Sequence, residues 1–160
     1  MLALLFPREF DNTYRGQWVG RWLFIFVVLA RLAIGINSTV NTRFVAMSAD
    51  GIPLDRYGAA AADTVTTLFG ISGSFLVLLS LMGLLVFFRY RAMIPFMFLL
   101  LLVDQLARRV ILLLHPIAKS GVATANLGLG FVLLILGATI VGLLLSLWPS
   151  APSESVRRER

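Results

Sequence analysis

Hydrophobic positions fall into four long runs along the chain, separated by shorter polar segments. A helix needs about 20 apolar residues to cross a bilayer core about 30 Å thick. The four runs, at about 18–38, 64–88, 92–115 and 126–148, are close to that length. The run at 64–88 is the clearest, because none of its 25 residues is charged. We therefore predict an all-α fold, an integral membrane four-helix bundle with one transmembrane domain over residues 18–148.

The segments outside these runs have other patterns. Residues 1–17 mix apolar and charged positions at helical spacing, which predicts an interfacial segment on the cytoplasmic side. The charged residues 149–160 predict a cytoplasmic tail. The longest connection, 37–63, is rich in turn formers, and its apolar residues (Phe44, Val45, Met47, Ile52, Leu54 and Tyr57) could lie on the bilayer surface. Asp63 is expected to cap the amino end of the second span.

Composition supports this reading and narrows the chemistry. The chain is 59% hydrophobic and 14% charged, whereas about a quarter of the residues of a soluble domain are charged. The absence of cysteine excludes disulfides, thiol catalysis and thiolate metal sites. The one histidine, His115, is too few for a histidine-based metal site but leaves a singly ligated pigment open. We therefore predict no metal site and no catalytic residue.

Positive charge sets the expected orientation. The net charge of +6 does not indicate nucleic-acid binding, because the cations lie beside or inside apolar runs. With both termini in the cytoplasm, the cytoplasmic segments hold Arg8, Arg15, Arg21, Arg89, Arg91, Arg157, Arg158 and Arg160, and the outer ones hold Arg43, Arg56 and Lys119. Cytoplasmic loops are enriched in Lys and Arg. The sequence thus predicts a multi-pass protein of the bacterial cytoplasmic (inner) membrane, N-in and C-in, with the longer outer loop between the first two helices.

Charged residues inside the predicted spans are the best functional lead. Each costs roughly 2.5–3.5 kcal/mol near the bilayer centre. If the bilayer core begins near Trp22 and Met93 on the cytoplasmic side, a rise of about 1.5 Å per residue puts Arg31 about 14 Å and Asp104 about 16 Å into it. We therefore expect the two side chains to face each other. Asp104 also precedes Arg108 by four residues, the favourable order on a helix. The complete set of candidate residues is Arg31, Asp104, Gln105, Arg108, Arg109 and His115.

One carboxylate cannot neutralise three guanidinium groups, so the spans carry a formal excess of two positive charges. Two explanations remain open. Arg109 and Arg108 could extend to water near the outer boundary and meet outer-side acids (Asp50, Asp55 or Asp63). Alternatively, the cluster could hold an anionic guest, such as a lipid phosphate or carboxylate, or a quinone or pigment bound through its oxygens.

Small residues at helix-contact spacing predict packing seams, which could instead meet a partner subunit or a second copy of the chain. Gly35 and Ser38 follow Arg31 by one and two turns. We expect them to form a face on which another helix could approach closely. Two further seams are Thr66, Gly70 and Ser74 on the second span, and Ala138, Gly142 and Ser146 on the fourth.

Arg31 follows an apolar run and precedes Leu-Ala-Ile-Gly at residues 32–35. This arrangement resembles the first span of small DoxX-like four-helix bacterial membrane proteins, and the likeness in pattern covers about half of the chain. The resemblance implies a four-helix membrane fold and carries over no functional residue. The long connection and the charged third span depart from the pattern.

These features favour a non-catalytic accessory or structural subunit of a larger membrane assembly, for example a bioenergetic one. A small protein that binds a lipid, quinone or pigment at the intramembrane cluster is the alternative. An oligomeric transporter is a third hypothesis, because four helices need further copies to enclose a path. An enzyme is least expected, since the one acid in the spans lies beside arginines. The predicted partners are membrane lipids and other membrane subunits or copies of the chain, and no nucleic acid.

Overall fold

The computed structural model describes residue 5 and residues 12–116 and 125–148. Most of the expected interfacial segment, residues 117–124 of the loop expected between the third and fourth spans, and the tail at 149–160 lie outside the described residues. All regular elements of the described part are helical, which confirms the all-α prediction for it. They are α2 (Trp18–Val40), α3 (Thr42–Ser48), η1 (Leu54–Arg56), α4 (Ala59–Arg89), η2 (Arg91–Met93), α5 (Ile94–Leu114) and α6 (Ala125–Leu147).

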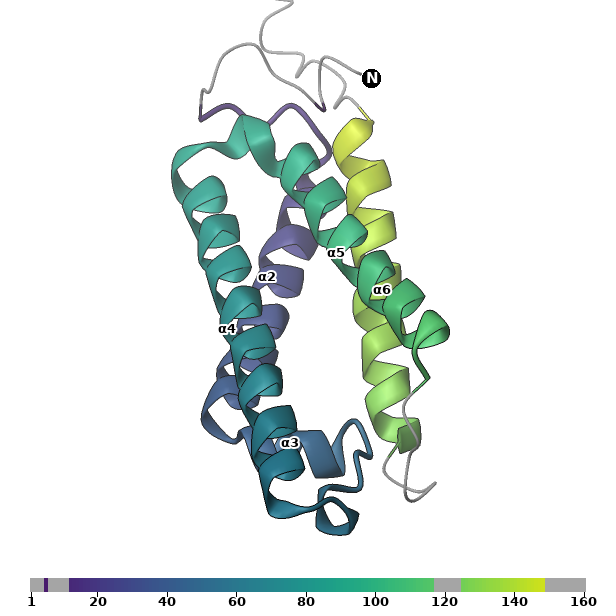
Figure 1. Ribbon diagram of the computed structural model, residues 1–160. Helices are drawn as coiled ribbons and strands as arrows, with labels where there is room; N and C mark the ends of the chain where they lie inside the picture. The colour runs from purple at the N-terminus through teal and green to yellow at the C-terminus, as the bar shows by residue number, and fades with distance from the viewer. Residues whose placement is uncertain (1–4, 6–11, 117–124, 149–160) are drawn as a thin grey trace, which may run out of the picture.

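The four longest described helices, α2, α4, α5 and α6, lie side by side (Figure 1). α2 packs along both α4 and α6, whereas α5 packs mainly on α6 and has few backbone contacts with α2. The start of α2 meets the end of α6, because the Gln17 N–H donates to the Leu145 carbonyl over 3.1 Å. The turn between α4 and α5 lies at this same end of the bundle (Figure 1).

A stripe of inward residues on α2 explains why Arg31 is buried. The buried positions of this helix recur every three or four residues, which keeps them on one face. Arg31 lies within this stripe, so the face that packs against the neighbouring helices carries a guanidinium group. The stripe comprises Gly20, Phe24, Val27, Val28, Arg31, Gly35 and Ser38.

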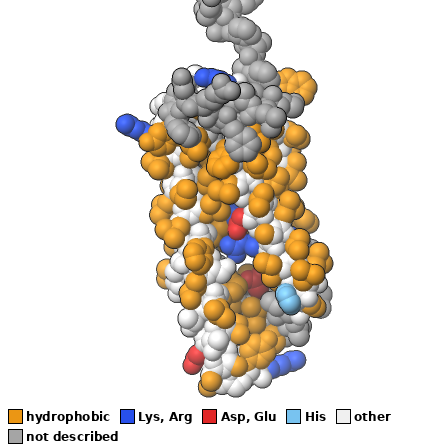
Figure 2. Space-filling view, turned by 45° about the horizontal axis from the view of Figure 1, so that its top comes forward, with side chains coloured by type: hydrophobic (Ala, Val, Ile, Leu, Met, Phe, Trp, Pro, Cys, Tyr) orange, Lys and Arg blue, Asp and Glu red, His pale blue; other side chains and the backbone are white. Residues whose placement is uncertain are grey.

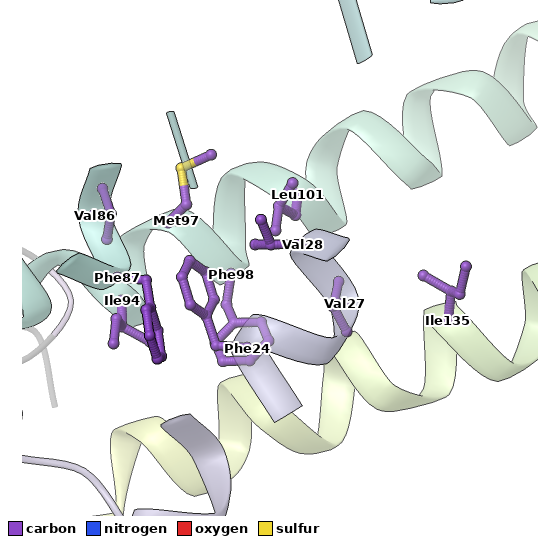
Figure 3. Close-up of a cluster of buried hydrophobic side chains, with 10 residues drawn as sticks. All are labelled: Phe24, Val27, Val28, Val86, Phe87, Ile94, Met97, Phe98, Leu101 and Ile135. Atoms are coloured by element: carbon purple, nitrogen blue, oxygen red, sulfur yellow. The ribbon is translucent and has the colours of Figure 1, made fainter. Parts of the chain in front are cut away.

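The main hydrophobic core gathers side chains from all four long helices (Figure 3). At its centre the rings of Phe24 and Phe98 meet edge to face, with centroids 5.1 Å apart. The buried residues of α5 all lie in its first half, and the last of them is Leu101. Residues 110–114 of α5 are exposed. The last turn of α5 therefore has little packing against the described part of the chain.

A second, smaller core lies under the connection between α2 and α4. Ala46, Ile52 and Leu54 are buried there against partly buried neighbours on α4, among them Val65 and Phe69. The connection therefore packs on the helices through Ile52 and Leu54, whereas Phe44 stays 70% exposed. The buried members of the apolar set therefore pack within the protein, and exposed members such as Phe44 are available to a bilayer surface.

α4 begins at Ala59, earlier than the expected start near residue 64. A run of alanines from Ala59 favours the helix, and Gly58 occupies the N-cap position. Asp63 therefore lies within the helix, and the prediction that it caps the amino end is wrong.

Three helices are long and apolar enough to cross a membrane: α2, α4 and the part of α6 at Gly130–Leu147. α5 has 21 residues, a comparable length, but carries Asp104, Arg108 and Arg109. Length and composition alone thus account for three spans among the described residues, and the fourth depends on how α5 satisfies its charges.

The small-residue seams have partners within the chain. A Cβ added to Gly35 would lie 2.9 Å from the Val77 nitrogen, so the helix that approaches this face closely is α4. A Cβ on Gly142 would lie 2.3 Å from the ring of Phe98 on α5. Ser146 approaches Gly20, and Ala138 is partly buried against the main core. The seam on the fourth span thus packs against α5 and α2.

The seam expected at Thr66, Gly70 and Ser74 is not the principal contact of α4 with α2. Thr66 and Ser74 donate hydrogen bonds to carbonyls of their own helix, and Gly70 lies near Thr42. The small residues of α4 that are buried are Ala62, Gly73, Ser80 and Gly83. Gly73 packs against Ser38 and Thr39, and Gly83 against Val28.

Candidate functional site

Arg31 reaches from α2 to α5 through its side chain. It is only 4% exposed, and its guanidinium donates to the Leu101 carbonyl over 2.9 Å. It also forms an ion pair with the Asp104 carboxylate, as the matching depths of the two residues predicted. Burying a charge is very unfavourable unless it is paired and hydrogen-bonded. Arg31 meets both conditions, and it links two helices whose backbones scarcely touch.

Asp104 is shared between two arginines. Besides Arg31, it accepts from Arg108 Nε at 3.2 and 3.3 Å, one turn along the same helix. Arg108 Nη1 in turn donates to Ser72 Oγ on α4 over 2.9 Å. Arg31, Asp104, Arg108 and Ser72, which we name the Arg–Asp cluster, therefore join α2, α5 and α4.

The cluster carries one more positive than negative charge, because two guanidinium groups face one carboxylate. Its members differ in access: the Arg31 side chain is 5% exposed, that of Asp104 27% and that of Arg108 41%. Figure 2 shows acidic and basic side chains together at a hollow in the middle of a largely hydrophobic face. The accessible part of the cluster is thus its cationic Arg108 side.

Gln105 faces a different helix from Asp104. Its Nε2 donates to Thr139 Oγ1 on α6 over 2.9 Å, and Thr139 donates to the Ile135 carbonyl over 2.7 Å. Thr139 is fully buried. Gln105 therefore joins α5 to α6 and does not belong to the Arg–Asp cluster.

Arg109 and His115 also lie outside the cluster. Arg109 is partly exposed, and within the described residues its side chain has no hydrogen bond or ion pair. His115 is exposed, and its backbone N–H donates to the Ile111 carbonyl. Of the outer acids expected near the arginines, Asp55 instead pairs with Arg43 at 3.6 Å, with both side chains largely exposed.

Sequence reasoning found the charged members of the cluster but missed Ser72, Thr139 and the Leu101 carbonyl. Hydroxyl residues are frequent in apolar helices, so Ser72 and Thr139 carry no signal of their own. Their roles depend on the register of α4 and α6 against α5. The spacing of small residues on α4 pointed instead to Thr66, Gly70 and Ser74.

The cluster offers hydrogen-bond donors and positive charge. Within the described residues, no group of three His, Cys, Asp or Glu side chains could hold a metal ion. The accessible guanidinium and the serine hydroxyl suit an oxyanion. Comparison with known proteins finds no match among family models, curated proteins or solved structures. The resemblance to DoxX-like proteins thus stays a prediction.

Proposed function

We propose that the chain is a multi-pass protein of the bacterial inner membrane in which α2, α4, α5 and α6 each cross the bilayer. Three of these helices are apolar enough to span on composition alone. For α5, the ion pair of Asp104 with Arg31 and its bond to Arg108 support a transmembrane position, because they satisfy charges that would otherwise oppose insertion.

The tryptophans support this placement. Trp18 and Trp22 lie at the start of α2 and Trp148 follows the end of α6, and all three are more than half exposed. Exposed tryptophans at one end of a bundle are typical of a membrane–water interface. The start of α2 and the end of α6 lie on this side. The excess of arginine in the segments that flank them in the sequence favours the cytoplasm for it.

Within that membrane we propose a non-catalytic subunit of a larger assembly. The observation that carries this proposal is that Arg109 has no polar partner among the described residues. This cation lies in the second half of α5, which is mostly apolar and exposed. A membrane-spanning partner with a carboxylate at the depth of Arg109 would neutralise it. Mutual neutralisation of intramembrane charges commonly joins helices.

Purification in a mild detergent, followed by native mass spectrometry, tests the proposal. We expect a stoichiometric membrane partner that is retained by the wild type and by Arg109→Lys, and lost from Arg109→Gln. Arg43→Gln is the control, because Arg43 lies in an exposed ion pair outside the four long helices. A monodisperse wild-type monomer without a partner would contradict the proposal, as would a partner retained equally by all variants.

A further inference from the structure

The accessible side of the Arg–Asp cluster has the properties of an anion site. Arg31 is almost completely buried, which keeps its guanidinium out of reach of a ligand, and its charge is compensated by that of Asp104. Arg108 therefore carries the surplus positive charge of the cluster, and its side chain is 41% exposed. The burial of Arg31 thus makes the charge of Arg108 available.

Unused donors point in the same direction. A guanidinium has five N–H groups. Arg108 uses its Nε–H toward Asp104 and one Nη1–H toward Ser72, so three remain without an acceptor in the described part of the chain. Ser72 Oγ accepts the bond from Arg108 and still has its own proton to donate. Arg108 and Ser72 can thus bind an oxyanion jointly, across the space between α5 and α4.

Apolar side chains flank this pair on both helices. Leu68 and Phe75 lie one turn to either side of Ser72 and are 61% and 63% exposed, and Leu112 lies one turn beyond Arg108 and is 44% exposed. Leu114, the last residue of α5, lies six positions beyond Arg108, a length of about 9 Å along the helix. A ligand that reaches Arg108 from that end passes along apolar side chains.

We infer that Arg108 and Ser72 form a binding site for the oxyanion of an anionic amphiphile, whose apolar chain lies against the exposed side chains of α4 and α5. The shared chemistry is a phosphate or carboxylate attached to a hydrocarbon chain. Asp104 holds the Arg108 guanidinium in place through Nε, and Arg31 keeps the Asp104 charge from repelling the ligand. The site is separate from the partner contact proposed at Arg109.

Native mass spectrometry of the full chain in a neutral detergent tests this site with three probes: phosphatidylglycerol, oleate and the zwitterionic phosphatidylcholine. We expect an anionic probe to bind in preference to phosphatidylcholine. Arg108→Gln should weaken that binding about tenfold or more, since hydrogen bonds to a charged group are the stronger ones. Preference for phosphatidylglycerol identifies a phosphate ligand, and preference for oleate identifies a carboxylate.

Arg109→Gln is the matched control, because it removes the same charge one residue away without touching Ser72 or Asp104. It should leave the binding of the anionic probe unchanged. Equal losses in Arg108→Gln and Arg109→Gln would show general attraction to positive charge and overturn the inference, as would the absence of any anionic preference. If Arg108→Gln does not fold, Ser72→Ala decides: weaker binding supports the site, and unchanged binding overturns it. A lost partner in Arg109→Gln bears only on the proposed subunit function.

Discussion

Removal of either member of the Arg31–Asp104 pair should destabilise the bundle by different amounts. Asp104→Asn leaves the buried Arg31 without a counter-ion, and loss of one partner from a buried pair costs about 3–5 kcal/mol. Arg31→Met should cost less, about 2–3 kcal/mol, because Asp104 keeps its bond to Arg108 and its side chain is 27% exposed. The order of the two effects follows from the sharing of one carboxylate by two arginines.

The double variant, with Arg31→Met and Asp104→Asn together, measures the interaction between the two residues. With both groups neutral, neither is left as an uncompensated buried charge, so we expect the double variant to be destabilised by at least about 1 kcal/mol less than the sum of the single variants. Reversible unfolding in mixed detergent micelles, followed by circular dichroism, measures the three free energies. Arg43→Met is the control, and loss of its exposed pair with Asp55 should cost no more than about 1 kcal/mol.

Additive effects, within about 0.5 kcal/mol, would refute the reasoning, because they would mean that Arg31 and Asp104 do not interact in the folded protein. A larger loss for Arg31→Met than for Asp104→Asn would refute the sharing of Asp104 with Arg108.

Two further predictions concern the contacts of α6. Gly142→Ala should destabilise the fold by about 1–3 kcal/mol in the same unfolding assay, because the new Cβ would meet the buried ring of Phe98. Gly137→Ala is the control and should not destabilise the fold, because its new Cβ would have nothing within 4 Å. Equal effects of the two substitutions would contradict this packing. Burial raises the pKa of Tyr14 above its ordinary value of 10.0, although its hydrogen bond with Ser146 opposes the shift. Because the fold favours the neutral phenol, the free energy of unfolding should fall as the pH rises above about 10.0. Tyr14→Phe should reduce this loss of stability at alkaline pH. An unchanged dependence of stability on pH in the variant would contradict the prediction.

The sequence predicts the helices well where one physical signal is dominant. The uncharged run on α4 and the apolar runs of α2 and α6 give their positions, because each needs only local hydrophobicity. The start of α4 was missed because Asp63 is a good cap residue in isolation, whereas the alanines before it extend the helix.

The candidate site was predictable only in part, for a similar reason. The pairing of Arg31 with Asp104 could be predicted because it needs only the depth of each residue along its helix. That depth follows from the residue position and the rise per residue. The role of Ser72 and the contact of Gly35 with α4 depend on helix rotation and on which helices are neighbours. A single sequence contains no measure of either.

The position of α5 across the membrane is the central claim, because the proposed intramembrane position of the Arg31–Asp104 pair and the proposed sites depend on it. The chain has no cysteine, so single cysteines can be introduced at Tyr90, before α5, and at His115, after it. Labelling of intact bacterial cells with a membrane-impermeant maleimide measures which side each one faces. We expect His115→Cys to be labelled from outside and Tyr90→Cys only after the inner membrane is permeabilised. Labelling of both residues from the same side would contradict the account.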